Sequence, residues 1–135
     1  MRFISDLHIH SQYSRATSKD FSPESIWKWA QLKGISVMGT GDFTHPQWMK
    51  ELEEKLKPEG NGLFSLKRAF QTLDVPDSCR ASVFLLLSSE ISCIYRKGDK
   101  VRKIHAIVLA PSFRDAEKII AALSTVGNLN ADGRP

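Results

Sequence analysis

The sequence predicts an α/β fold in which parallel strands are connected by crossover helices. Short apolar segments alternate with helix-like segments from Phe3 to Leu56, an order typical of parallel strands with crossover helices. The most apolar run, Val83–Leu87, is too short for a typical helix and suits a strand buried on both faces. Ionisable residues follow several of these strands, where functional groups collect in such folds.

Composition places the chain among folded proteins with one domain. It has 135 residues, of which 41% are hydrophobic, enough for a core. The net charge of +4 is compatible with a polyanionic partner. Cys79 and Cys93 form no metal-type pair or disulfide framework, and neither a signal peptide nor a membrane-length apolar run is visible. We therefore expect a soluble, cytoplasmic protein with no membrane partner.

The N-terminal segment carries the strongest chemical signal. After Phe3 and Ile4, polar and apolar residues alternate, so a strand here would project Asp6, His8 and His10 from one face. Two imidazoles on one face suit a divalent metal such as zinc, and Asp6 could fix an imidazole tautomer from behind. The alternative is a pair of surface or packed histidines.

Local signals predict the next elements in order. Residues 12–21 are polar and indicate a loop, and Ser22-Pro23-Glu24 predicts a helix that runs to about Lys33 and stops at Gly34. Residues 35–39 form a short apolar strand, and residues 47–56 form a helix that begins at Pro46.

The second half of the chain is predicted from spacing and turns. Leu66, Ala69, Phe70 and Leu73 have helical spacing, so a third short helix is expected within residues 63–77. The strand at residues 82–88 ends at Glu90, and residues 91–95 and 101–109 form a hairpin around Gly98. Ser112-x-x-Asp115 caps a last helix, which ends at Gly127.

Five ionisable residues fall within or just beyond these strands: His8, His10, Asp42, Glu90 and His105. A carboxylate between imidazoles can bridge two metal ions, and paired ions catalyse hydrolysis of phosphate esters. Each of these residues also has an explanation that needs no metal site: Glu90 as a surface charge, His105 as a core histidine and Asp42 as a turn cap. His45 is better explained by a turn or cap, and neither a phosphate-binding P-loop nor a nucleophile elbow is present.

These motifs resemble the polymerase and histidinol phosphatase (PHP) superfamily, and more closely its endonuclease Q family. The resemblance rests on residues 6–18, 39–48, 90–98 and 101–105. It implies a PHP-type distorted (β/α)7 barrel and a metal-dependent phosphodiesterase. Such an enzyme nicks DNA on the 5′ side of deaminated bases (uracil, hypoxanthine) or of abasic sites in DNA repair. Family members often carry a helicase label, which no motif here supports.

Transferred by position, the resemblance assigns the site residues. His8, His10, Glu90 and His105 match metal ligands with Glu90 as the bridge, and Asp42 matches the second motif as a further ligand; Asp42 and Glu90 are the candidate catalytic residues. Arg15 replaces a common acid and Phe43 a common histidine. A third metal would therefore lack ligands, which favours two divalent ions, zinc first and manganese or magnesium as alternatives. Arg15 is instead expected to contact a phosphate.

The length departs from the family pattern. A closed barrel needs roughly 200 residues or more, so residues 1–135 are expected to be the N-terminal half of the domain. Further ligands and a DNA-binding region would then lie beyond Pro135. Alone, such a fragment should have an open sheet edge and exposed apolar helix faces, bind metal weakly and nick DNA poorly.

DNA is the expected partner because the predicted hairpin is basic. The cations of the hairpin are Arg96, Lys97, Lys100, Arg102 and Lys103. The sequence leaves protein partners and the preferred DNA lesion open. A solvated charged hairpin is the alternative. Trp48 is better explained by core packing than by base stacking. The competing functions are a small-molecule phosphatase of the same superfamily and an inactive metal-binding or scaffold module.

Overall fold

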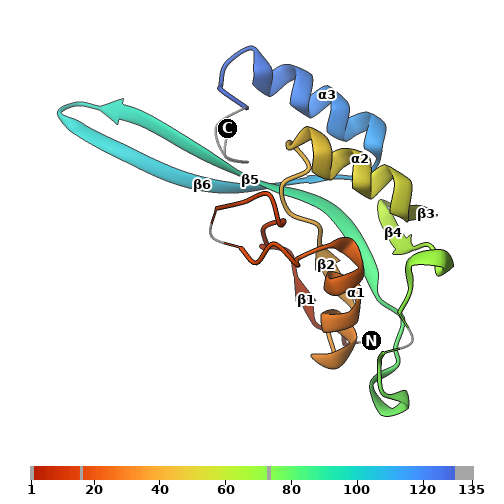
Figure 1. Cartoon of the computed structure of the whole chain (residues 1–135). Coiled ribbons are helices and arrows are strands. Elements are labelled where there is room, and N and C mark those ends of the chain that lie inside the picture. Colours follow the sequence, from red (N-terminus) through yellow and green to blue (C-terminus); the bar gives the residue numbers. More distant parts are fainter. Residues whose placement is uncertain (1, 16, 73, 130–135) are drawn as a thin grey trace.

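A single long strand, β5 (Phe84–Lys97), belongs both to the central sheet and to a hairpin that projects from the body (Figure 1). The computed structural model describes residues 2–15, 17–72 and 74–129. The sheet order is β1-β2-β5-β4-β3, and β6 pairs with β5. The other strands are β1 (Ser5–Asp6), β2 (Val37–Gly39), β3 (Leu56–Gly60), β4 (Leu63–Leu66) and β6 (Lys100–Ala110).

The sheet is mixed, which the alternation of strands and helices did not predict. β1 pairs with β2 in parallel, and β2 pairs with β5 in parallel, as expected for crossover connections. β6 runs antiparallel to β5, which confirms the predicted hairpin around Gly98. β4 also runs antiparallel to β5, however, and β3 runs antiparallel to β4. The α/β class is therefore confirmed, while the expectation of parallel strands holds only for β1, β2 and β5.

The three helices begin where the sequence predicts, two of them after a serine cap and one at a proline. Helix α1 (Pro23–Leu32) begins after Ser22, whose Oγ accepts a hydrogen bond from the Ser25 N–H at 3.3 Å. Helix α2 (Pro46–Lys55) begins at Pro46. Helix α3 (Phe113–Ser124) begins after Ser112, whose Oγ accepts from the Asp115 N–H at 3.1 Å. These side chains satisfy N–H groups that have no partner within the helix.

The predicted third helix within residues 63–77 is wrong. The segment contains β4 and two single 3-10 turns, Arg68–Phe70 and Asp77–Cys79; Leu73 lies outside the described residues. β3 and β4 form a hairpin through Asn61 and Gly62, which both have positive φ, 53° and 80°. Burying Phe64 and Leu66 on one face of a strand outweighs the helical spacing that Leu66 shares with Ala69 and Phe70.

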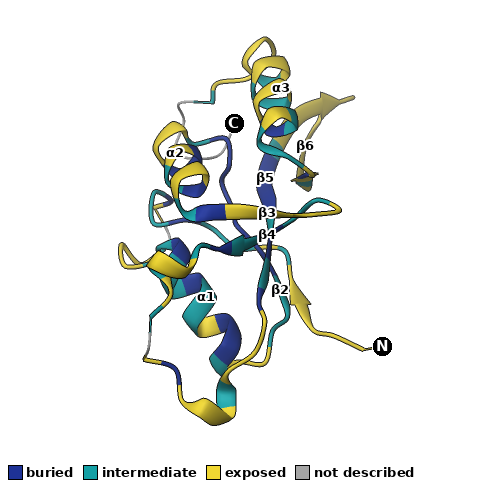
Figure 2. Cartoon of the chain, turned by 90° about the vertical axis from the view of Figure 1, so that its right-hand side faces the viewer, coloured by how far each residue is buried: buried dark blue, intermediate teal, exposed yellow. Residues whose placement is uncertain are grey.

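The core lies between the sheet and the faces of the helices that turn toward it (Figure 2). Trp48 and Phe43 are fully buried in it with Leu85 and Leu87 of β5, so the core interpretation of Trp48 is confirmed. At the edge of the sheet, Phe3 beside β1 is 64% exposed, and Trp29 on α1 is 51% exposed. Within residues 2–15, 17–72 and 74–129, no helix has the length and apolarity needed to cross a membrane.

Candidate metal centre

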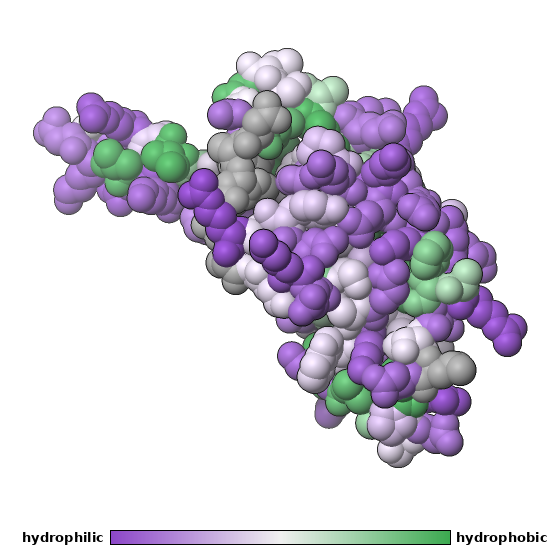
Figure 3. Space-filling view, viewed as in Figure 1, coloured by the Kyte–Doolittle hydropathy of each residue, from purple (hydrophilic) through white to green (hydrophobic). Residues whose placement is uncertain are grey.

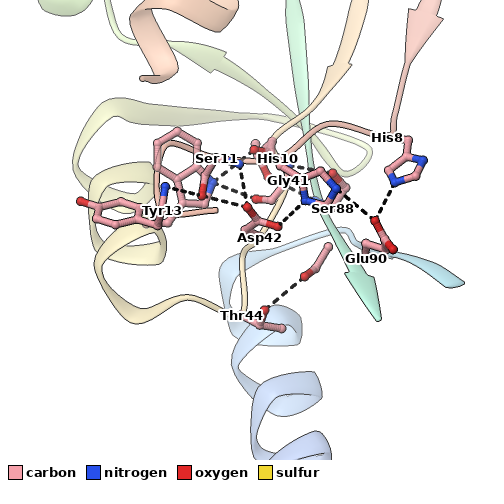
Figure 4. A network of polar contacts seen from close by, with 12 residues as sticks. His8, His10, Ser11, Tyr13, Gly41, Asp42, Thr44, Ser88 and Glu90 are labelled. Atoms are coloured by element: carbon pink, nitrogen blue, oxygen red, sulfur yellow. Dashed lines mark hydrogen bonds and ion pairs between the residues drawn. The ribbon is translucent and has the colours of Figure 1, made fainter. Parts of the chain in front are cut away.

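Three separate segments bring imidazoles and a carboxylate together (Figure 4). His8 and His10 lie in the loop that follows β1, Glu90 lies in β5, and His105 lies in β6. The strand alternation expected to align His8 with His10 is absent, because β1 ends at Asp6. Another feature must therefore position this loop.

Close contact with two glycines fixes the path of the loop. A side chain at Gly39 would come within 2.6 Å of the Leu7 carbonyl oxygen, and one at Gly41 would overlap the Ile9 carbonyl oxygen. Gly41 also has φ +67°, a conformation that glycine adopts without steric cost. Residues 7–10 thus lie directly on the backbone that follows β2, which only glycine permits at these two positions.

Asp42 connects the two loops with both of its carboxylate oxygens. Oδ1 lies 3.1 Å from Nδ1 of His10, and Oδ2 accepts hydrogen bonds from the Ser11 N–H at 2.7 Å and the Ser11 hydroxyl at 2.9 Å. The residue is fully buried and has φ +45°, in the left-handed region that aspartate tolerates better than most residues. A carboxylate on Nδ1 leaves Nε2 of His10 as the nitrogen that can accept a metal.

Asp6 lies elsewhere in the network. Its Oδ1 accepts a hydrogen bond from the His8 backbone N–H at 3.2 Å, and so it shapes the start of the loop. The imidazole-orienting geometry that the sequence analysis assigned to Asp6 is present at Asp42, on the ring of His10.

Glu90 is the centre of the cluster. Its Oε2 lies 2.8 Å from Nε2 of His8 and 3.0 Å from Nε2 of His10, and its Oε1 contacts Nδ1 of His105. His105 reaches it because Ser92 pairs with His105 across the hairpin, which places His105 on the same face as Glu90, one diagonal step away.

The position of Glu90 differs from the predicted strand end. β5 continues seven residues beyond it, so Glu90 lies in mid-strand, just after the part of β5 that pairs with β2. It is 3% exposed. Burial alone would raise the pKa of its carboxyl, but the hydrogen bond from His8 and the charges of His105, His10 and His8 together hold that pKa below its usual range. The carboxylate therefore stays ionised at neutral pH.

The donor set fits a metal ion. One donor atom from each of His8, His10 and Glu90 lies within 4.8 Å of the other two. Glu90 Oε1 is buried and faces Nδ1 of His105 without forming a hydrogen bond of good geometry, so both carboxylate oxygens of Glu90 face imidazole nitrogens. Two imidazoles and a carboxylate leave one position of a tetrahedral zinc ion open, as catalytic sites do. Asp42 and His105 lie outside this group of three.

The other candidate residues lie away from the cluster or toward its rim. Arg15 is exposed in the segment before α1. Lys97, Lys100, Arg102 and Lys103 are exposed in the outer half of the β5–β6 hairpin. The imidazole of His45 stacks on the Tyr13 ring, with centroids 4.4 Å apart, and does not join the cluster.

Two serines support the site without an obvious sequence signal. Ser11 donates to Asp42 through its backbone N–H and its hydroxyl, and the Ser88 hydroxyl accepts from the Gly41 N–H at 2.9 Å (Figure 4). Trp48 Nε1 donates to the Gly41 carbonyl at 2.8 Å. The bonds of the two serines join segments 31 and 47 residues apart, and only the adjacency of Ser11 to His10 hinted at a role.

The comparisons with known proteins agree with this architecture. No protein-family model matches the chain. An uncharacterized protein of Methanocaldococcus jannaschii is 37% identical over 84 residues, which is 62% of this chain and 10% of that protein. The crystal structure of the lesion-specific endonuclease PfuEndoQ from Pyrococcus furiosus superposes with a TM-score of 0.74 at 28% identity over the whole chain.

A crystal structure of endonuclease Q with a 27-mer duplex substrate, which has an abasic lesion at the active site, also superposes with a TM-score of 0.74, at 31% identity. In both comparisons this chain spans 29% of the solved chain. The likeness covers all of the present sequence, and it shows that the chain has an endonuclease Q-like fold.

Proposed function

We propose that this chain carries part of the metal centre of a DNA repair endonuclease that hydrolyses a phosphodiester bond. The observation that carries the proposal is the buried Glu90 carboxylate faced by His8, His10 and His105. The proposed cut lies 5′ of an abasic site or of a deaminated base, within a PHP-type barrel of which this chain forms a part. The abasic duplex bound by the solved endonuclease Q supports the choice of substrate.

The residues have separate proposed roles. His8, His10, Glu90 and His105 would hold the divalent ions, zinc or alternatively manganese or magnesium, with the Glu90 carboxylate as the shared ligand among the three imidazoles. Bound ions lower the pKa of a water molecule and stabilise charge on the phosphate oxygens. Asp42 accepts a hydrogen bond from Nδ1–H of His10 and so holds that ring in the tautomer that binds metal.

The charge distribution favours DNA over a small phosphate ester. The hairpin segment 91–110 has five cations and a single acid, so its formal charge of +4 equals that of the whole chain. Such a projecting basic surface suits a polyanion, whereas hydrolysis of a small phosphate ester does not require one. The remaining alternative is an inactive metal-binding module, which the nicking assay tests.

Activity is tested on the full-length product of the gene that encodes this chain, because the chain spans 29% of the solved endonucleases. End-labelled duplexes with one abasic site, uracil or hypoxanthine are incubated with Zn²⁺, Mn²⁺ or Mg²⁺. We expect a single metal-dependent nick 5′ of the lesion, and loss of nicking in Glu90→Gln and His10→Ala.

His45→Ala is the matched control, because His45 stacks on Tyr13 outside the cluster and should leave nicking intact. Nicking that persists in EDTA or in His10→Ala would contradict the proposal. Hydrolysis of a sugar phosphate with no cleavage of any duplex would favour the small-molecule phosphatase, and metal binding without either activity would favour the inactive module.

A further inference from the structure

The projecting hairpin has two faces, and only one of them bears the metal-centre residues Glu90 and His105. Partners in an antiparallel pair point to the same side, and alternate residues along a strand do too. The face that bears Glu90 and His105 therefore continues through Ser92, then Ile94 with Lys103, then Arg96 with Val101. We call this the metal-side face.

The opposite face contains the remaining cations. Tyr95 pairs with Arg102, and Lys97 pairs with Lys100. Cys93 also belongs to this face, in register with Ile104. The five cations that the sequence presents as one basic cluster are thus divided, with Arg96 and Lys103 on the metal-side face and three on the other.

Several cations of the body are paired with acids, although others, such as the exposed Lys50 and Arg114, have no salt bridge among the described residues. Lys28, Lys55, Lys57, Arg80 and Lys118 all form salt bridges with carboxylates. Among the described residues, no salt bridge involves any of the five hairpin cations, and all five are exposed. Hydrophilic side chains gather on the projecting hairpin around a small hydrophobic patch (Figure 3). Exposed positive charge without a protein partner is suited to phosphate contacts.

We propose that the metal-side face of the hairpin is a track for the DNA backbone, in which Lys103 and Arg96 bind successive phosphates of the strand that enters the metal centre. The proposal rests on the endonuclease function proposed above and assigns residues to its substrate path. Arg96 lies six residues from Glu90, about 20 Å along an extended strand. At 3.4 Å of rise per nucleotide, that length covers roughly six nucleotides.

The apolar residues on this face are consistent with the same partner. Ile94 is 63% exposed and Val101 is 54% exposed, and each pairs with one of the two cations. Aliphatic side chains between cations can lie against sugars or base edges while the cations hold the phosphates. The right-handed twist of a two-stranded ribbon turns this face gradually along its length, as a helical backbone requires.

Two double variants with the same composition test the track. Arg96→Gln/Lys103→Gln removes an arginine and a lysine from the metal-side face, and Lys97→Gln/Arg102→Gln removes the same pair from the opposite face. Binding to a duplex with one abasic site is measured by fluorescence anisotropy over a range of salt concentrations. Each lost phosphate contact lowers the salt slope by about 1, so we expect a drop of about 2 for the first variant and little change for the second.

A cross-linking experiment locates the DNA directly. Both proteins carry Cys79→Ser and one hairpin thiol, either native Cys93 or a thiol from Ser92→Cys combined with Cys93→Ser. The duplex bears a thiol tether on a backbone phosphate next to the lesion. We expect a disulfide with the residue 92 thiol on the metal-side face and not with Cys93, although Cys93 is the more exposed of the two native residues.

The outcomes separate this inference from the proposed function. Equal losses in the two double variants, or equal cross-linking at both thiols, would overturn the track and leave the endonuclease proposal standing. Absence of DNA binding by the unaltered full-length protein would overturn the track and remove the proposed substrate as well. Circular dichroism of each variant confirms that the fold is retained.

Discussion

The carboxylate of Asp42 lies 3.1 Å from Nδ1 of His10, and the opposite nitrogen of the same ring lies 3.0 Å from Glu90. His10 is thus held between two carboxylates, one from the loop that follows β2 and one from β5. A carboxylate at Nδ1 fixes the tautomer and the orientation of the ring. Many metal sites use such a contact to direct the opposite nitrogen at the ion.

Asp42→Asn should weaken metal binding by about 10- to 100-fold, the usual effect of losing such an outer partner. An amide offers one acceptor where the carboxylate offers two, so either His10 or Ser11 loses its bond. The change should also reduce the free energy of unfolding by about 1–3 kcal/mol, because a buried polar group is left unpaired. Zinc titration and urea denaturation measure the two effects.

Asp6→Asn is the matched control for Asp42→Asn. Its amide oxygen can still accept from the His8 N–H, so metal affinity should change little. Similar losses of affinity in both variants would show that Asp42 has no special role in orienting the ring.

Gly41→Ala should displace the loop that carries both N-terminal histidines, because the added methyl group would overlap the Ile9 carbonyl. Gly34→Ala is a suitable comparison, since Gly34 has nearly the same φ, +68°, but nothing within 4 Å of the added atom. Gly34→Ala should cost only the backbone strain, about 1–2 kcal/mol. Gly41→Ala should cost more and should also lower zinc affinity; equal effects would contradict the close-contact argument.

The Glu24–Lys55 ion pair should make stability depend on pH in two windows. Burial alone would raise the pKa of Glu24, but the hydrogen bond from Lys55 holds it below 4.5. Burial alone would lower the pKa of Lys55, but Glu24 and Glu51 hold it above 10.5. The Glu24 contribution is therefore full above pH 4.5 and is lost as pH falls through the lowered pKa. The Lys55 contribution is full below pH 10.5 and is lost as pH rises through the raised one.

Glu24→Gln should consequently lower the free energy of unfolding at pH 7 by no more than about 1 kcal/mol, as partly exposed pairs do. The difference between the unaltered chain and Glu24→Gln should disappear in acid and shrink in strong base. Urea midpoints measured across this range provide the comparison, and a difference that is constant with pH would rule out the ion pair as its source.

Zinc should raise the melting temperature of the chain, because a ligand that binds only the folded state stabilises it. The gain is about 2.7 kcal/mol when free zinc is a hundred times its dissociation constant. The rise should be absent in Glu90→Gln and His10→Ala and preserved in His45→Ala, which removes a histidine outside the cluster. A rise lost equally with His45 would indicate non-specific zinc binding.

Helix starts could be predicted from sequence because their causes are local. Ser22 and Ser112 each accept from the backbone N–H three residues ahead, and Pro46 begins its helix with a φ that its ring already fixes. No distant contact is needed for any of these features, so the printed sequence contains the whole cause.

The β3–β4 hairpin was missed although a local signal was present. Asn61-Gly62 is the dipeptide preferred in two-residue hairpin turns, where both central residues have positive φ. The four residues of β4 are too few to establish a period of two against the competing helical spacing of Leu66, Ala69 and Phe70.

The chemistry of the site was easier to predict than its geometry. His8, His10, Glu90 and His105 stand out by residue type, and the structure brings all four together. The strand alternation invoked to align His8 with His10 was wrong, because glycine contacts and the Asp42 bonds place the loop. Such contacts join segments about 30 residues apart, and no local rule encodes them.

The continuity of β5 places Glu90 at the midpoint of one strand that runs from the core to the hairpin tip. No turn or bulge interrupts its pairing with β6 from Leu87 to Lys97. The buried carboxylate and the outer hairpin therefore belong to one ladder of paired residues, and the register of that ladder would align with Glu90 any ligand bound along the hairpin.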